Sequence, residues 1–187
     1  YGIWKITESV KWLHGQADLK KNEQGYLEKI HNTLRKKQSI AAKIILNKIA
    51  NKKVNVSYNE YGAPIAANFK NISISHSNKL SMALISEDNI GIDIQLKSSK
   101  LNIIQSKFIN QNDINSFLKP EDFLHHAWCS KEAIYKTLKG SPCSFKKDIF
   151  IKNLTKRKSL GLYKKTTFEI YHEVFEDYFI SIAKKMT

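Results

Sequence analysis

Cysteine is scarce in this sequence of 187 residues, which contains only Cys129 and Cys143. Two thiols cannot cross-link a fold of this size, and neither lies at the spacing of a zinc ligand set. Long hydrophobic runs are also missing, since no stretch approaches the ~20 apolar residues of a membrane span, and no secretory signal pattern opens the sequence. We therefore expect no membrane partner and a protein that works in the reducing cytoplasm, with a buried Cys129 as a small packing residue.

Acidic residues are few: 17 against 31 basic residues, which gives a net charge of +14. Such an excess favours polyanionic partners, namely nucleic acid, an anionic membrane, a phosphorylated cofactor or an acidic protein. The motifs that would choose among these are absent. There is no zinc finger, helix-turn-helix signature or aromatic RNA-binding motif, and no phosphate loop, dinucleotide fingerprint or His-Glu-x-x-His. Charge alone therefore leaves the partner open.

The hydrophobic pattern of the first half predicts helix followed by strands. Apolar residues at three- and four-residue steps predict a helix from about 22 to 49, broken or bent near 36–38, after a short strand at 2–6. Alternation and turn residues then predict strands at 54–58, 72–75, 80–86 and 90–96, the last three forming a hairpin meander.

The second half repeats this order. Pro120 opens and Gly140 closes a long predicted helix over 121–138, preceded by short helices at 101–108 and 113–118. Alternating segments predict a terminal antiparallel meander with strands at 145–151, 160–163, 168–174 and 178–183. The whole pattern predicts an α+β fold of two related lobes, residues 1–88 and 89–187, instead of a parallel α/β sheet.

A carboxylate interrupts the apolar strand Ile90-Gly91-Ile92-Asp93-Ile94-Gln95. A charge in such a strand is paired, lies at a strand end or binds a metal, and Gly91 permits a close approach by a ligand or another backbone. A turn cap or a pair with a single lysine would explain Asp93 equally well, so both interpretations stay open at this point.

The long helix contains Trp128-Cys129-Ser130-Lys131-Glu132-Ala133-Ile134-Tyr135-Lys136. Glu132 and Lys136 are one turn apart and share a helix face, whereas Lys131 faces another side. An exposed pair of this kind is common and contributes only about 0.3 kcal/mol. A strand carboxylate and a helix carboxylate can also converge on one hard cation, so Asp93 and Glu132 are candidate metal ligands.

His76 follows a predicted strand in Ile74-Ser75-His76-Ser77. A serine-hydrolase site is excluded because there is no nucleophile elbow and no glycine flanks either serine. A lone histidine is usually a structural hydrogen-bonding residue, but at a strand end near basic residues it can also donate to a phosphate oxygen.

Taken together, three blocks of this sequence resemble the 4'-phosphopantetheinyl transferase superfamily in its single-chain, surfactin-synthetase-activator type. The first block is Tyr61-Gly62-Ala63-Pro64 with the following Ile74-Ser75-His76-Ser77, the second is Gly91-Ile92-Asp93-Ile94, and the third is the helix motif that ends at Lys136. The third block matches the family pattern W-x-x-K-E-[SA]-x-x-K. The resemblance covers the chain from about Leu34 to its end.

The resemblance implies two pseudo-symmetric α+β lobes with coenzyme A in the cleft between them. It also implies a reaction in which a serine hydroxyl of an apo acyl or peptidyl carrier protein attacks the β-phosphorus of coenzyme A. Phosphopantetheine moves to the serine, and 3',5'-ADP leaves. Acidic carrier proteins would explain the basic surface, to which residues 110–124, including Phe117, are expected to contribute.

The family roles carry over to individual positions. Asp93 and Glu132, with Gln95, would hold Mg2+ or Mn2+, and Glu132 would act as general base, with Asp113 as the second candidate. His76 would contact a diphosphate oxygen, and Lys131 and Lys136 would add positive charge. The remaining expected contacts to coenzyme A are Gly62, Ala63, Pro64 and Ser75 at the adenine and ribose end, and Arg35, Lys36 and Lys43 at the 3'-phosphate.

Two positions depart from the pattern of many relatives. Gln95 stands where they have a glutamate, and Ala63 stands where some have a lysine, so we expect weaker metal binding and weaker affinity for coenzyme A. A monomer would suffice for such an enzyme. The alternatives are a basic α+β module that binds nucleic acid and a coenzyme A-binding relative without transfer activity.

Overall fold

The computed structural model describes residues 1–113 and 118–186, and they form an α+β protein with antiparallel sheets. The chain divides into two compact units, residues 1–87 and 88–187, next to a predicted boundary at 88/89. No helix within the described residues has both the length and the hydrophobicity needed to cross a membrane. Phe117 and most of the helix predicted over 113–118 lie outside the described part of the chain.

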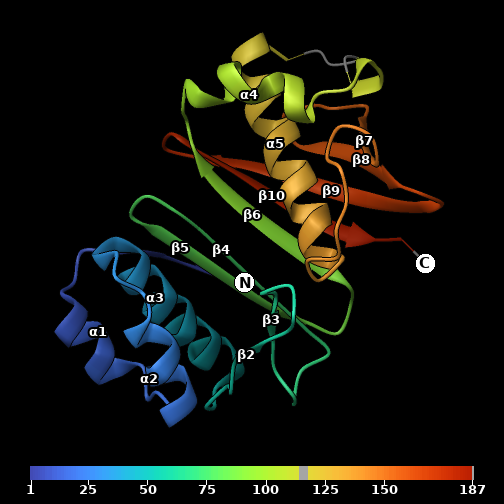
Figure 1. Ribbon diagram of the computed structural model, residues 1–187. Coiled ribbons are helices and arrows are strands. Elements are labelled where there is room, and N and C mark those ends of the chain that lie inside the picture. Colours follow the sequence, from blue (N-terminus) through green and yellow to red (C-terminus); the bar gives the residue numbers. More distant parts are fainter. Residues whose placement is uncertain (114–117, 187) are drawn as a thin grey trace. The chain divides into compact units, whose positions relative to one another are not determined.

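The first unit combines three helices with a three-stranded antiparallel sheet in the order β1-β5-β4 and a small ribbon of β2 and β3 (Figure 1). Its elements are β1 Gly2–Lys5, α1 Val10–Gln16, α2 Lys21–Glu28, α3 Thr33–Ala50, β2 Ser57–Tyr58, β3 Pro64–Ile65, β4 Asn71–Ser77 and β5 Leu80–Ser86. The inner face of α3 is almost entirely apolar from Ile40 to Leu46 and packs against β5 and β1. Burial of this face is what holds the helix on the sheet.

The long helix of the first half begins later than its pattern predicted. We expected a helical segment from about 22 with a break or bend near 36–38. The break lies earlier, between the end of α2 at Glu28 and the start of α3 at Thr33, and α3 runs unbroken through 36–38. The side chain of Asn32 accepts a hydrogen bond from the backbone N–H of Arg35 at 2.9 Å, which fixes the start of α3. The short helix α1 was not predicted, and the strand predicted over 54–58 is reduced to Ser57–Tyr58.

The second unit is a five-stranded antiparallel sheet in the order β6-β10-β9-β8-β7, with α5 lying along one face (Figure 1). Its elements are β6 Ile90–Leu96, α4 Lys100–Phe108, a short 3-10 turn at Gln111–Asp113, α5 Pro120–Thr137, β7 Ile149–Lys152, β8 Lys158–Tyr163, β9 Thr166–Phe175 and β10 Tyr178–Lys185. The predicted terminal meander is confirmed, and so are α4 and α5 within two residues at either end.

The predicted partner of the strand at 90–96 is wrong. A meander would pair it with β5, but β6 pairs with β10, the last strand of the chain, over Ile90 to Leu96. Only β4 and β5 form the expected hairpin. The pairing of β6 with β10 joins residues that are more than eighty positions apart in the sequence. Local turn signals carry no information about such a pairing.

Gly91 is the point at which α5 rests on β6. A Cβ atom at this position would lie 3.0 Å from the backbone nitrogen of Thr137 and 3.1 Å from the carbonyl carbon of Ala133. Every second residue of a strand faces the same side, so residues 91, 93 and 95 lie on one face of β6. The helix that covers Gly91 therefore also covers Asp93. The close approach predicted for Gly91 is confirmed, and the partner that approaches is a helix backbone.

Candidate functional site

Asp93, Glu132 and Lys136 come together in the second unit, where α5 crosses β6. Asp93 is buried, with 6% of its surface exposed, and its Oδ1 accepts a hydrogen bond from Lys136 Nζ at 2.8 Å. Glu132 lies one turn before Lys136 on α5, as the spacing predicted. The strand carboxylate and the helix carboxylate therefore face the same place.

The electrostatics confirm that these two carboxylates are close. The pKa of Glu132 is raised from its ordinary value of 4.5 to about 7, mainly by burial and also by the negative charge of Asp93, with the Lys136 ammonium opposing both effects. Two carboxylates that share a partly dehydrated site repel each other unless a cation lies between or beside them. Lys136 supplies one such cation for Asp93.

The lysine of this cluster keeps access to solvent. The side chain of Lys136 is 23% exposed, whereas that of Asp93 is 8% exposed. The Lys136 side chain is therefore more accessible to an anion from solvent than the Asp93 side chain is. The arrangement suits a phosphorylated ligand that brings its own divalent cation.

Gln95 lies two residues beyond Asp93 on the same face of β6. Its amide nitrogen donates to the carbonyl oxygen of Leu96 at 3.0 Å, and its amide oxygen is a candidate neutral donor to a metal. Within residues 1–113 and 118–186, no three His, Cys, Asp or Glu side chains gather as a metal site. The candidate donor set is thus two carboxylates and one amide oxygen, and hard oxygen donors of this kind fit Mg2+.

Cys129 packs beside this cluster as a neutral thiol. It is fully buried, and its Sγ lies 3.5 Å from the carbonyl oxygen of Phe179. Burial raises the pKa of the Cys129 thiol well above its ordinary range, and the charge of Asp93 adds to the effect. A thiol that stays protonated is no nucleophile, so the packing role expected for Cys129 fits the structure.

Lys131 and Asp113 belong to the core of the second unit, and this corrects the roles expected for them. Both side chains are 0% exposed, and Lys131 Nζ lies 2.6 Å from Asp113 Oδ2. The same ammonium donates to three backbone carbonyl oxygens at 2.8 to 2.9 Å, those of Phe108, Phe145 and Ile149. A lysine with four partners and no exposed surface has no donor left for a phosphate.

The carboxylate of Asp113 is equally engaged. Its oxygens accept from the backbone N–H groups of Asn110 at 2.7 Å and Ile151 at 2.8 Å, in addition to Lys131. It therefore ties the 3-10 turn to β7 and to α5 and is not placed to receive a proton from a substrate. Glu132 remains as the candidate base.

The role expected for Lys43, in the first unit, is also corrected. It is buried on α3, where its Nζ lies 2.5 Å from Glu23 Oε1 and also donates to the carbonyl oxygen of Val54. The backbone N–H of Val56 donates to the same carboxylate oxygen at 3.2 Å. This pair joins α2 and α3 to the segment before β2 and does not offer a surface cation to a 3'-phosphate.

Arg35 keeps the properties of an anion ligand. Among the described residues, its Nη1 is one of two buried side-chain nitrogen or oxygen atoms without a hydrogen-bond partner. It lies in the first turn of α3 with Lys36, and that turn has no acidic residue. Two cations at a helix N-terminus are unfavourable beside the positive end of the helix dipole. An anion bound there would be stabilised by the cations and by the dipole together.

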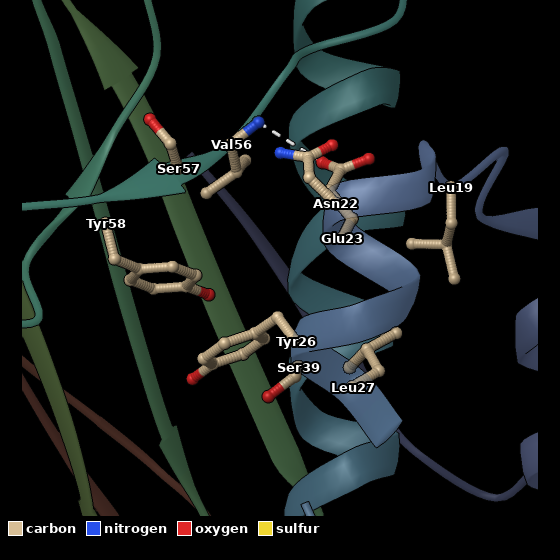
Figure 2. A pocket seen from close by; sticks show the side chains of 9 residues that line it. All are labelled: Leu19, Asn22, Glu23, Tyr26, Leu27, Ser39, Val56, Ser57 and Tyr58. Atoms are coloured by element: carbon tan, nitrogen blue, oxygen red, sulfur yellow. Dashed lines mark hydrogen bonds between the residues drawn. The ribbon is translucent and has the colours of Figure 1, made fainter. Parts of the chain in front are cut away.

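A cavity of about 290 Å³ opens in the first unit between α2, α3 and β2 (Figure 2). The rings of Tyr26 and Tyr58 stack in its wall with centroids 4.5 Å apart, and the Ser39 hydroxyl lies beside them. Burial and the neighbouring Tyr26 raise the pKa of the Tyr58 phenol, whereas the charge of Arg35 lowers it. The Tyr58 hydroxyl therefore stays protonated and can donate.

The other candidates of the first unit lie on its ribbon and on β4. Gly62 has a φ of +76° in the turn between β2 and β3, where the Asn59 side chain accepts from the backbone N–H of Ala63 at 2.8 Å. A residue with a side chain would be strained there. Pro64 begins β3, and Ser75 and His76 follow each other on β4, with Ser75 buried.

The candidate residues thus divide between the two units. Asp93, Glu132 and Lys136 form one cluster within the second unit, with Gln95 further along the same face of β6. The expected coenzyme A contacts of residues 35, 36, 62–64, 75 and 76 lie in the first unit. That coenzyme A joins the two groups stays a prediction.

One feature of the second unit was missed in the sequence. Phe168, Ile170 and His172 alternate along β9, and this period of two places His172 on the buried face beneath α5. The signal was present, but no local motif pointed to the histidine.

Comparison with models of known protein families gives no match for this chain. Comparison with curated proteins likewise finds no relative.

Proposed function

We propose that this protein transfers the 4'-phosphopantetheine group from coenzyme A to a serine of an apo acyl or peptidyl carrier protein in a Mg2+-dependent reaction. The observation that carries the proposal is the convergence of Asp93, Glu132 and Lys136 where α5 crosses β6. These are the residues that the resemblance names for metal and phosphate binding. The proposed fold is that of the 4'-phosphopantetheinyl transferases, with two related lobes.

Asp93 and Glu132 would hold the cation, with the amide oxygen of Gln95 as a neutral third donor. When bound, Mg2+ would neutralise charge on the diphosphate of coenzyme A and so favour attack at phosphorus. The two carboxylates repel each other, and a divalent cation bound to both would offset that repulsion, which favours its binding there. The uncharged Gln95 predicts weaker affinity than a third carboxylate would give.

Glu132 would take the proton of the attacking serine. Its pKa of about 7 applies without metal; a bound Mg2+ would lower that pKa and keep Glu132 ionised at neutral pH, the state in which it can accept a proton. The serine oxygen forms the new bond to the β-phosphorus, and the bond from that phosphorus to the leaving 3',5'-ADP breaks. Lys136, which keeps contact with solvent, would balance negative charge on the phosphate oxygens.

In the first unit, Arg35 would bind an anionic group of coenzyme A. Its buried and unpartnered Nη1, with the Tyr58 phenol nearby, supports this role, and Lys36 adds charge on the same helical turn. His76 would donate to a diphosphate oxygen. The net charge of +14 suits an acidic carrier protein as the second substrate.

The experiment is intact-mass analysis of apo carrier proteins incubated with the full chain, coenzyme A and Mg2+, with and without a chelator. We expect a metal-dependent mass gain of one phosphopantetheine group per carrier. Glu132→Gln and Asp93→Asn should abolish the gain, and Glu28→Gln, an exposed change on α2, should leave it intact. No gain with several acidic carriers and folded protein would contradict the proposal.

Binding measurements then distinguish the alternatives. Coenzyme A affinity without transfer would indicate a relative that binds but does not react, and a large activity gain in Gln95→Glu would locate the defect at the metal. A nucleic-acid-binding module would instead show affinity for nucleic acid that falls steeply with salt concentration and is unchanged in Asp93→Asn.

A further inference from the structure

Four polar side chains form a row across the sheet of the second unit, one from each of four neighbouring strands. Asp93 on β6 is the register partner of Ser181 on β10, and Ser181 is the register partner of His172 on β9. Residues directly opposite in antiparallel strands face the same side of the sheet, with Cβ atoms about 4.5–5.5 Å apart. Ser159 on β8 continues the row beyond His172.

The row is dry, and its histidine is within hydrogen-bond distance of both serines. His172 Nε2 lies 2.8 Å from Ser159 Oγ, and His172 Nδ1 lies 3.0 Å from Ser181 Oγ. Ser181 is fully buried, and at most 9% of any of the other three residues is exposed. The ring of His126, on α5, covers His172 edge to face at 4.8 Å. Water therefore does not compete for these hydrogen bonds.

A neutral imidazole has one donor nitrogen and one acceptor nitrogen, so the hydrogen bonds on its two sides run in the same direction along the row. Burial, with a smaller effect of His126, lowers the pKa of His172 to about 3, so the ring carries one N–H at neutral pH. One ring nitrogen then donates to one serine, and the other accepts from the opposite serine. If Nδ1 is the accepting nitrogen, the Ser181 hydroxyl donates its hydrogen to the ring. If Nδ1 carries the hydrogen, the Ser181 hydroxyl can donate to Asp93 instead.

We infer that His172 is a positioning residue for Asp93 and acts on it through Ser181. The Ser159 hydroxyl donates to Nε2, Nδ1–H donates to Ser181 Oγ, and the Ser181 hydroxyl donates to the carboxylate of Asp93. This direction places every donor toward the anionic end of the row, where the field of the carboxylate favours it in a dry site. The opposite direction would aim the donors away from the charge.

The consequence concerns the orientation of the Asp93 carboxylate. Lys136 holds Oδ1 from the helix side, and the row holds the carboxylate from the sheet side. Carboxylates that bind metals are oriented by such hydrogen bonds, and their loss weakens affinity by about 10- to 100-fold. The inference rests on the proposed function in one respect, that Asp93 is a metal ligand.

The direction of the row is tested first, on the metal-free full chain. Two-bond 1H–15N correlation spectra report which ring nitrogen of His172 carries the hydrogen. We expect Nδ1–H in the wild type and in Ser159→Ala, which leaves the Ser181 contact intact. Ser181→Ala should move the hydrogen toward Nε2. A wild-type ring with Nε2–H would overturn the inference.

The effect on Asp93 is tested by calorimetric titration with Mg2+ in the absence of coenzyme A. Ser181→Ala should weaken binding by about tenfold or more, and Ser159→Ala should have a smaller effect. A matched pair separates positioning from packing. His172→Asn places an amide nitrogen near the Nδ1 position and should retain affinity, whereas His172→Gln reaches toward Ser159 and should lose it.

Equal Mg2+ affinity in the wild type, Ser181→Ala and His172→Gln would overturn the inference while leaving the proposed function intact. A wild type that binds no Mg2+ would instead contradict the metal part of the proposed function. The ring spectra still decide the direction of the row in that case, because they require neither metal nor coenzyme A. Folding of every variant is checked by circular dichroism.

Discussion

Replacement of Gly91 by alanine tests how the site is built, because this residue lets α5 lie directly on β6. The new Cβ would approach Thr137 N to 3.0 Å and Ala133 C to 3.1 Å, and the Ala133 carbonyl oxygen would be closer still. All of these atoms belong to the helix backbone, so no side chain can rotate out of the way. The helix has to move off the strand.

The expected cost follows from the nature of the obstacle. Overpacking a core by a methyl group costs 1–3 kcal/mol where side chains can adjust, and more where they cannot. We therefore expect Gly91→Ala to lower the free energy of unfolding of the second unit by about 3 kcal/mol or more. Any displacement of α5 also separates Glu132 from Asp93, so metal affinity should fall even in the fraction that stays folded.

Two glycines serve as matched controls. At Gly161 the atoms nearest to a new Cβ are Cδ1 and Cγ1 of Ile134 and Cδ1 of Ile170, which belong to side chains that can shift, so alanine should cost less there. At Gly25, inside α2, nothing lies within 4 Å, and alanine should stabilise the helix by roughly 0.5–1 kcal/mol.

The assay is urea-induced unfolding followed by tryptophan fluorescence. Trp4 and Trp12 lie in the first unit and Trp128 lies on α5, so a Trp4→Phe/Trp12→Phe background makes Trp128 the reporter of the second unit. If Gly91→Ala proves as stable as Gly161→Ala in this background, the backbone contact between α5 and β6 does not exist as described.

Three further predictions concern buried charge. Lys131→Met leaves the Asp113 carboxylate buried without its ion-pair partner, so we expect a loss of about 3–5 kcal/mol in urea unfolding; a much smaller loss would show that the pair is hydrated. Glu132 has a folded pKa of about 7 above its ordinary 4.5, so without metal the folded chain holds the extra proton and stability falls as the pH rises from 4.5 to 7. Glu132→Gln should remove that slope and stabilise the protein by at most about 3 kcal/mol above pH 7, and an unchanged slope would contradict the assignment. Burial lowers the folded pKa of His126 from 6.5 to about 4, so stability is lost as the pH falls through that window. His126→Phe, which also removes an unpartnered buried Nδ1, should reduce the acid sensitivity measured by unfolding between pH 6.5 and 4; equal sensitivity would show that His126 is solvated.

Local patterns predicted most of the elements correctly, and the errors have identifiable causes. The strands β5 and β6 and the helices α4 and α5 were predicted within two residues, because period and terminal signals are both strong there. The position of the break before α3 was missed, because Asn32 gives a weaker signal than a glycine or proline. The partner of β6 was missed because strand pairing over a long separation leaves no local trace.

The two lysines of the helix motif show the same limit at the level of side chains. The sequence placed Lys131 and Lys136 on different faces of α5, and this is confirmed. It could not show that one face meets solvent and Asp93, whereas the other meets Asp113 and a ring of carbonyl oxygens. The surroundings of each lysine come from α4, β7 and β6, which are distant in the chain.

The sequence by itself determined the α+β class, most of the longer helices and strands, the excess of basic residues and the residue types of the candidate site. These are local properties, set by the spacing of apolar, turn-forming and charged residues along the chain. Only the tertiary structure decided that Asp93 meets Glu132 and Lys136, that Lys131 and Lys43 are buried in ion pairs, and that His172 lies in a polar row leading to Asp93. The reason is physical: charge, burial and hydrogen bonding depend on neighbours in space, and the neighbours of these side chains are supplied by strands and helices far apart in the sequence.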